Sequence, residues 1–289
     1  MSSESKRNTA IVFGITRDLA PAVGSVLLDL IEVKRNKNFD VHIFHDGISK
    51  RNKIAIQKIA NVDFTRFHPK ISRVTKTVPS VRQFTPMVFS KYECLKLLKN
   101  YESVLWLDCD IIIQSNIDEI FDFPNSDMVF VSATRPVRGQ FVEPVDHYDM
   151  DSESMSAGII VFNRNRLSDV HYEYCLQQTE KFNLNLIMPE QGIFDLMIQD
   201  FELNCTRLDP EIYACHPMSP NRDSAKIIHA YGQPKFWNGR LDIHWEKNSE
   251  SWKALGGSPY RNWVRSRKVR RKAMYIGNLL LSKIEKGSA

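Results

Sequence analysis

Short apolar segments alternate along the first part of the chain with longer segments whose apolar positions repeat every three or four residues. The short segments predict strands at residues 9–15, 40–45, 62–67 and 103–107. The longer ones predict helices at residues 22–33 (opened by Pro21), 50–60 and 87–99. Residues 70–86 show no clear period and are expected to form a loop or lid. The alternation predicts an α/β fold with a doubly wound, mostly parallel sheet of the Rossmann type.

The second half of the chain also contains both strand patterns and helix patterns. Further strands are expected at residues 128–132, 156–162 and 225–229, and helices at 167–181 and 190–199. Residues 133–151 form a polar loop, and 201–214 are expected to hold short strands or turns. In open α/β sheets, ligands bind beyond the carboxyl ends of the strands. Gly14-Ile-Thr-Arg-Asp18 and Asp108-Cys-Asp110 both lie at such ends, so one nucleotide could touch both.

Two carboxylates stand between two apolar runs. Asp108 and Asp110 follow the predicted strand 103–107 and precede Ile111-Ile-Ile113. Side chains alternate along an extended chain, so the two carboxylates point to the same side. Two like charges in so apolar a setting are costly unless a cation compensates them, and a divalent metal bearing a phosphate would do so. The alternative is an ordinary strand end whose carboxylates face water or cap a turn.

Composition limits the class of protein. The 289 residues suffice for one large α/β domain, and the composition, 43% hydrophobic and 25% charged, is that of a globular protein. The five cysteines form neither a C-x-x-C motif nor an even framework, which fits a reducing compartment. No apolar run approaches the length of a membrane span, and the N-terminal segment is too short for a secretory signal. We therefore expect a cytoplasmic protein.

The positive charge is concentrated in the C-terminal tail, residues 261–289. This tail holds nine of the 39 Lys and Arg residues and one of the 34 Asp and Glu residues. The rest of the chain therefore has 30 basic and 33 acidic side chains, with no basic face or motif for nucleic acid. Basic residues interleaved with Trp263, Val264 and Val269 suit an anionic membrane surface. The alternative is a solvated, partly disordered end.

Five segments together resemble glycosyltransferase family 8, which includes glycogenins and bacterial lipopolysaccharide galactosyl- and glucosyltransferases. The segment from Leu105 to Phe121 is similar to the family's metal-binding segment. The others occur in the same order: Phe89-Ser-Lys91-Tyr, Met155-Ser-Ala-Gly-Ile-Ile-Val-Phe162, Pro189-Glu-Gln-Gly-Ile-Phe194 and Ile228-His-Ala-Tyr-Gly-Gln-Pro-Lys-Phe-Trp-Asn238. The resemblance covers roughly residues 9–240. It implies a retaining enzyme with a GT-A fold over residues 1–260, a small C-terminal helical extension, and the tail.

The resemblance implies a metal site and a place for the diphosphate. Asp108, Asp110 and His229 would hold Mn²⁺ or Mg²⁺ bridging the phosphates of a UDP-sugar. Taken alone, a histidine at position 229 is more often structural. Gly232 would let the backbone approach the diphosphate, and Lys235 would supply charge against the departing nucleoside diphosphate.

The remaining donor-binding positions also follow from the resemblance. Gly14, Thr16 and Asp18 would hold uridine and ribose, although Thr16 replaces an expected Asp. Lys91 would contact the donor sugar or phosphate, with a solvated helix lysine as the alternative. The donor-sugar pocket would be lined by Asp108, Ser156, Ala157 and Gly158, with Ser156 in place of the usual Asn. Glu190, in place of an Asp, and Gln191 would face the sugar from the other side and act in catalysis.

The implied activity is transfer of a hexose, of glucose or galactose type, from a UDP-sugar to a saccharide or glycolipid acceptor, such as a bacterial surface glycan or lipopolysaccharide. An amide at Gln191 is a poor nucleophile, which favours front-face substitution with retention. Three alternatives remain at this point: a glycogenin-like self-glucosylating protein, a non-catalytic sugar-binding member, and a nucleotidyltransferase. The last is disfavoured because Gly14-Ile-Thr-Arg-Asp18 is poor in glycine.

Overall fold

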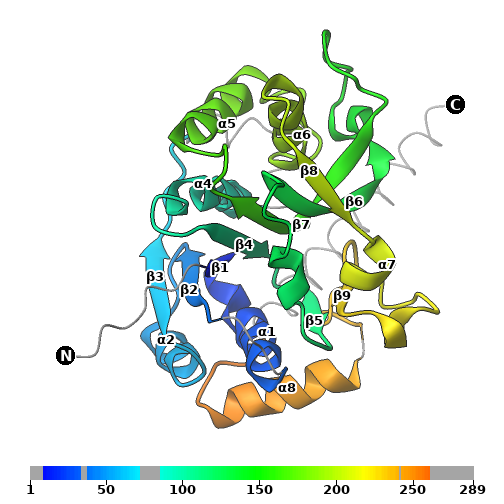
Figure 1. The fold of residues 1–289 in the computed structure, drawn as a ribbon. Helices are drawn as coiled ribbons and strands as arrows, with labels where there is room; N and C mark the ends of the chain where they lie inside the picture. Colours follow the sequence, from blue (N-terminus) through cyan, green and yellow to red (C-terminus); the bar gives the residue numbers. More distant parts are fainter. Residues whose placement is uncertain (1–8, 34–37, 72–84, 241, 261–289) are drawn as a thin grey trace, which may run out of the picture.

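A seven-stranded sheet forms the centre of the molecule (Figure 1). The structure is a computed structural model and describes residues 9–33, 38–71, 85–240 and 242–260. The sheet has the order β3-β2-β1-β4-β7-β6-β8. Its strands are β1 (Thr9–Ile15), β2 (Asp40–His45), β3 (Val62–Arg66), β4 (Ser103–Leu107), β6 (Met128–Pro136), β7 (Glu153–Asn163) and β8 (Cys205–Leu208).

The sheet is mostly parallel, as predicted. β3, β2, β1 and β4 are parallel neighbours, and β6 is parallel to β8. β7 is the exception, because it runs antiparallel to both β4 and β6. The carboxyl ends of β1 to β4 therefore meet at one edge of the sheet, where α/β proteins bind ligands.

A second, two-stranded sheet completes this edge. It consists of β5 (Ile111–Ile113) and β9 (Ile227–His229), which pair antiparallel. The register places His229 opposite Ile111, the residue directly after Asp110. Local pairing thus brings a distant segment of the chain beside the carboxylate pair.

Helices cover both faces of the main sheet (Figure 1). On one side lie α1 (Ala20–Glu32), α2 (Lys50–Gln57) and α8 (Ile243–Ala254); on the other lie α4 (Glu93–Leu97), α5 (Asp169–Lys181) and α6 (Gln191–Asp200). Side chains of β1 point alternately to the two faces of the sheet. Ile11 and Phe13 therefore pack in the hydrophobic core on the α1 side, whereas Ala10 and Val12 pack in the core on the opposite side. α8 is the expected helical extension and packs on α1.

Three segments differ from the sequence-based prediction. The polar loop expected at 133–151 begins with the end of β6 and a 3₁₀-helix, η5 (Val137–Gln140). The helix expected at 87–99 is a 3₁₀-helix, η3 (Pro86–Tyr92), followed by the short α4. It begins at Thr85, whose φ of 68° is left-handed and whose side chain accepts a hydrogen bond from the Met87 N–H. Residues 210–213 are helical (α7, Pro210–Tyr213) rather than strand or turn, because Asp209 caps the Glu211 N–H and Pro210 pre-sets the first turn.

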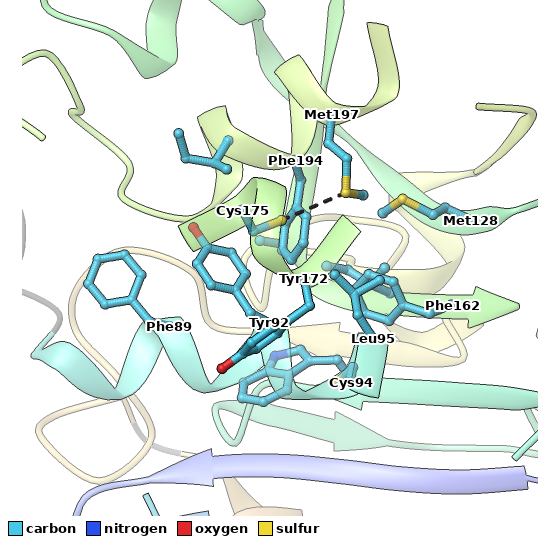
Figure 2. Packing of buried hydrophobic residues seen from close by; sticks show 14 of the residues in the cluster. Phe89, Tyr92, Cys94, Leu95, Met128, Phe162, Tyr172, Cys175, Phe194 and Met197 are labelled. Atoms are coloured by element: carbon cyan, nitrogen blue, oxygen red, sulfur yellow. Dashed lines mark hydrogen bonds between the residues drawn. The ribbon is translucent and has the colours of Figure 1, made fainter. Parts of the chain in front are cut away.

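An aromatic cluster joins η3 to α6 and β7 (Figure 2). The rings of Tyr92 and Phe194 meet edge to face with centroids 5.4 Å apart, and Phe162 of β7 lies 5.6 Å from Phe194. The Tyr92 hydroxyl bonds the Thr179 hydroxyl at 2.9 Å, inside a fully buried environment. The cluster therefore fixes the position of η3 relative to α6 and β7.

Trp252 anchors α8 against the rest of the molecule. A Cβ added at Gly24 or Gly257 would lie 2.3 or 2.0 Å from the Trp252 ring, so both glycines make room for it. The indole N–H donates to the Ser258 carbonyl at 2.8 Å. In the described part of the chain, no helix combines the length and hydropathy needed to cross a membrane. The tail, residues 261–289, and most of the expected loop at 70–86 lie outside the described residues.

Candidate metal and donor site

Asp108, Asp110 and His229 converge at the carboxyl end of β4. One ligand atom from each lies within 4.8 Å of the others. His229 Nε2 is 3.2 Å from Asp110 Oδ1 and 3.9 Å from Asp108 Oδ2. Asp110 and His229 are buried, whereas the Asp108 side chain is 31% exposed. Two carboxylates and an imidazole, open on one side, fit a divalent cation that retains ligand positions for water or phosphate.

Lys235 lies directly beside Asp110. Its ammonium group contacts Asp110 Oδ2 and donates to the Ala230 carbonyl at 2.7 Å. Burial alone would raise the pKa of Asp110, but His229 and Lys235 outweigh it and hold that pKa well below the usual range. Asp110 is therefore ionised at neutral pH. The predicted lysine thus lies beside the predicted metal ligands.

Lys91 joins Asp108 to Glu190. Its ammonium group lies 2.6 Å from Glu190 Oε1 and 3.4 Å from Asp108 Oδ1. Burial opposes the charge, but the two carboxylates raise the Lys91 pKa above its ordinary value. The predicted alternative, a solvated helix lysine, is wrong, because this residue is 5% exposed.

Trp106 is a site residue that the sequence analysis did not single out. Its indole N–H donates to Asp108 Oδ1 at 2.9 Å, and Lys91 Nζ lies 5.4 Å from the ring centroid. The sequence could have indicated Trp106 from its position two residues before Asp108, because side chains two apart along a strand lie on the same face. Trp106 fixes the orientation of the Asp108 carboxylate.

Gln191 is positioned by β7. Its side-chain oxygen, Oε1, accepts a hydrogen bond from the Ala157 N–H at 3.1 Å, and the residue is buried. The side-chain NH₂ of the same amide has two donors of its own. Gln191 and Glu190 lie at the start of α6, beside the strand that carries Ser156, Ala157 and Gly158. The structure therefore brings together the residues predicted for the donor-sugar pocket.

Gly158 permits the close approach of His229. A Cβ at this position would lie 2.4 Å from His229 Cε1, 3.0 Å from Nδ1 and 3.4 Å from Asp108 Oδ2. The Gly158 carbonyl also accepts the Asp108 N–H at 2.8 Å. Only glycine fits here without displacing the imidazole.

The nucleoside positions lie at the end of β1. Thr16 precedes the 3₁₀-helix η1 (Arg17–Leu19), and Asp18 is exposed within it. The Gly14 backbone lies against Ser90 and Trp106, since a Cβ there would approach them to 2.1 and 2.4 Å. Gly232 has a φ of +75° and no atom near its absent Cβ. Gly14 therefore makes room for its neighbours, whereas Gly232 supplies a left-handed backbone conformation that favours glycine.

Tyr231 is a second residue that the sequence analysis missed. It is 48% exposed, and its ring meets His229 and His216 with centroid distances of 5.7 and 5.0 Å. It directly precedes Gly232. An exposed aromatic ring therefore borders the metal-ligand cluster.

Comparisons with known proteins were made on both sequence and structure. The family model described as glycosyl transferase family 8 matches residues 10–240. No curated protein matches the chain significantly.

Several solved glycosyltransferases have a similar fold. The bifunctional glycosyltransferase WbbM aligns with a TM-score of 0.65 and 18% identity over 92% of this chain and 53% of that chain, so this chain spans about half its length. The galactosyltransferase LgtC, solved with donor and acceptor sugar analogues, aligns with a TM-score of 0.61 and 14% identity over 86% of this chain and 95% of that chain. GlyE of Streptococcus pneumoniae TIGR4 aligns with a TM-score of 0.59 and 15% identity, over 91% and 64%. At these identities the likeness concerns the fold.

Proposed function

The chain belongs to glycosyltransferase family 8, and from that premise we propose that it transfers a hexose from a UDP-sugar to a saccharide acceptor with retention of anomeric configuration. The observation that carries the proposal is the convergence of Asp108, Asp110 and His229, with Lys91 and Lys235 beside them. A glycosyl transfer role follows from the family and the fold. The donor, the metal and the acceptor are the proposed parts.

Asp108, Asp110 and His229 are the proposed ligands of Mn²⁺ or Mg²⁺. The donor set supports this, because hard carboxylate oxygens and one imidazole suit either ion. When bound, the cation would supply positive charge to the diphosphate leaving group. Lys235 supports the same task from the protein, since its flexible ammonium group can turn from Asp110 toward a phosphate oxygen.

Lys91 and Glu190 are proposed to orient the donor sugar. The pair is buried and charge-assisted, so it presents fixed hydrogen-bonding groups next to Asp108. Ser156, Ala157 and Gly158 line the same side in this proposal, and Glu190 selects among hydroxyl groups of the sugar. Gly14, Thr16 and Asp18 are proposed to hold the nucleoside at the end of β1, and Gly232 to approach the diphosphate with its backbone.

Gln191 is proposed to stabilise the reacting face of the sugar rather than to attack it. An amide oxygen is a weak nucleophile, and this one already accepts the Ala157 N–H. We therefore infer front-face substitution. The acceptor hydroxyl attacks the sugar from the same side from which the phosphate leaves, and an oxygen of that phosphate takes the proton of the hydroxyl. Gln191 donates hydrogen bonds to the oxygens that gain charge during this step.

The proposed acceptor is a bacterial surface glycan or lipopolysaccharide at the inner face of the membrane, with the protein otherwise cytoplasmic. The basic and apolar composition of residues 261–289 supports this, because such a segment suits an anionic lipid surface. Binding to the membrane would bring the protein to the surface in which a glycolipid acceptor is anchored.

UDP release tests the proposed function. The purified chain is incubated with Mn²⁺ and a panel of UDP-hexoses, with and without saccharide acceptors, and free UDP is measured. We expect release with one donor, increased by acceptor. Mass spectrometry of the protein after the reaction detects added hexose, which would instead indicate self-glucosylation. Absence of UDP release with every donor and acceptor would contradict the proposal.

Asp110→Asn tests the metal site. The variant keeps the shape of the side chain but loses the charge that pairs with Lys235, so we expect UDP release to fall by at least about 100-fold while the circular dichroism spectrum is unchanged. Asp122→Asn, at an exposed carboxylate outside the cluster, is the control and should retain activity. Wild-type turnover in Asp110→Asn would refute the assignment.

A further inference from the structure

A polar cavity lies at the same edge of the sheet as the metal-ligand cluster but shares no residue with it. Its volume is about 610 Å³, and it is lined by one residue of η1, by the end of β2 and the loop after it, by two residues of β3 and by one residue of α2. These residues are Arg17, His45, Asp46, Gly47, Ile48, Lys53, Phe64 and Arg66. In the sheet order, β1 separates β2 and β3 from β4, which leads to Asp108.

The cavity collects positive charge without matching acids. Arg17, Lys53 and Arg66 line it, and none of them forms an ion pair with another residue of the described ranges. Asp46 is the one carboxylate in the lining, and its Oδ1 accepts the Arg17 backbone N–H at 2.6 Å. The formal charge of the lining is therefore positive. Like charges gathered around a cavity are unfavourable unless an anion compensates them.

His45 provides a second, independent observation. It is 4% exposed, its Nδ1 accepts the Ile48 N–H at 3.4 Å, and its Nε2 has no hydrogen-bond partner. Because Nδ1 is an acceptor, the proton of the neutral ring resides on Nε2, which is then an unused donor. Burial, followed by the charge of Lys53, lowers the pKa of His45 and favours this neutral form. Buried donors without partners are rare in folded proteins.

We propose that this cavity binds a phosphate group through Arg17, Lys53, Arg66 and the His45 Nε2–H. Three cations and one carboxylate leave a formal charge that matches a phosphate dianion. The two guanidinium groups can each offer parallel N–H donors to phosphate oxygens. The volume lies within the usual range for small-molecule sites, so a phosphate carried by a larger molecule also fits. Its lining includes none of the residues proposed above to bind the donor or the metal, and its occupancy does not depend on the proposed function.

Titration of the full chain with inorganic phosphate tests the proposal. Divalent metal is removed with a chelator, binding is followed by calorimetry, and the His45 ring signals are followed by NMR. We expect saturable binding that shifts the His45 signals. Lys53→Gln and Arg66→Gln should each weaken binding about ten-fold, because each removes a charge-assisted contact. Lys50→Gln, an exposed lysine of the same helix that does not line the cavity, should leave binding unchanged.

Two competition arms identify the source of the phosphate. Displacement of inorganic phosphate by a soluble sugar phosphate indicates a metabolite, and displacement only by vesicles containing phosphatidic acid indicates a lipid headgroup. Either result supports a phosphate site. Absence of saturable binding, unmoved His45 signals, or equal effects of Lys50→Gln and Arg66→Gln would overturn the proposal. UDP release is measured separately, so failure of this inference and failure of the proposed transferase activity are distinguishable.

Discussion

The absence of a side chain at Gly158 determines how close His229 comes to the carboxylate pair. The imidazole occupies the space of the missing methyl group, with Cε1 2.4 Å from the position of an added Cβ. On its other side His229 reaches Asp110 at 3.2 Å. The geometry of the ligand cluster therefore depends on a residue that offers no ligand atom.

Gly158→Ala should displace His229 and reduce activity. A misplacement of about 1 Å in a catalytic arrangement lowers rates by roughly 100-fold, so we expect UDP release to fall by about that factor. Thermal unfolding should still be cooperative. Gly139→Ala is the control, because there the added methyl meets only the Arg135 side chain, at 3.1 Å or more. Unchanged turnover in Gly158→Ala would show that the imidazole position is not critical.

Asp195 makes stability depend on pH. Burial raises its pKa to about 7, although hydrogen bonds from Ser154 and the Met155 N–H act in the opposite direction. The unfolded chain loses this proton near pH 4, so between about pH 4 and 7 the folded state holds the extra proton. The free energy of unfolding therefore falls as pH rises through this range, by on the order of 4 kcal/mol.

Asp195→Asn should remove that decrease. Urea denaturation at pH 5 and pH 8 would give a smaller difference between the two values in the variant than in the wild type. Asp200→Asn, an exposed carboxylate of the same helix, serves as the control. An identical pH dependence in wild type and Asp195→Asn would contradict the prediction.

At the scale of elements, the site depends on how η3 is held against α6. Lys91 lies on η3 and Glu190 directly precedes α6, and their 2.6 Å contact bridges the two. The next residue along η3, Tyr92, packs on Phe194 of α6 (Figure 2). The ion pair and the aromatic contact thus connect the same two elements.

Phe194→Ala should loosen this connection. Removing a fully buried phenyl group costs about 3–5 kcal/mol of unfolding free energy, measurable as a lower urea midpoint. The Lys91–Glu190 pair should become less rigid, so UDP release should also fall. Ile187→Ala, at a 41% exposed position before the same helix, should change stability by less than about 0.5 kcal/mol. A loss no larger than that in Phe194→Ala would refute the proposed coupling.

The sequence predicts elements where local pattern determines them. The strands expected at 9–15, 40–45 and 103–107 coincide with β1, β2 and β4, because alternation and apolar runs are local signals. The helical interpretation of 87–99 was wrong for its first half, since apolar positions over seven residues do not separate a 3₁₀ period from an α period. The separate β5·β9 sheet depends on pairing between distant segments, which no local pattern contains.

The candidate site, too, is predictable only where local sequence pattern determines it. Asp108 and Asp110 could be singled out from their apolar surroundings alone. His229, Lys235, Lys91 and Gln191 required the resemblance, because the sequence alone does not indicate which distant residues fold beside the carboxylates. Trp106 had a local signal, its place two residues before Asp108, but its hydrogen bond to that carboxylate is seen only in the structure. The cavity with His45 depends on contacts among η1, β2, β3 and α2, which no local pattern contains.

At the scale of the whole molecule, charge is divided between the body and the tail. The residues before 261 are slightly acidic, with 30 basic and 33 acidic side chains, whereas the tail holds nine basic residues and one acidic one. Attraction to anionic lipid is therefore expected to act through the tail rather than through the body.

Deletion of residues 261–289 should therefore weaken membrane association. We expect the full chain to sediment with vesicles containing anionic lipid and to be released as salt is raised, because screening shortens electrostatic attraction. The deleted chain should stay in the supernatant while UDP release with a soluble acceptor is retained. Neutral vesicles are the control. Equal, salt-insensitive pelleting of both chains would retire the hypothesis.

The pairing of β5 with β9 also orders events during synthesis on the ribosome. The carboxylates at 108 and 110 emerge early, but the partner strand and the imidazole of His229 are added more than a hundred residues later. An incomplete nascent chain therefore carries two of the three residues of the ligand cluster and an unpaired Ile111–Ile113 segment. The three residues of the cluster are therefore all present only after translation has passed residue 229.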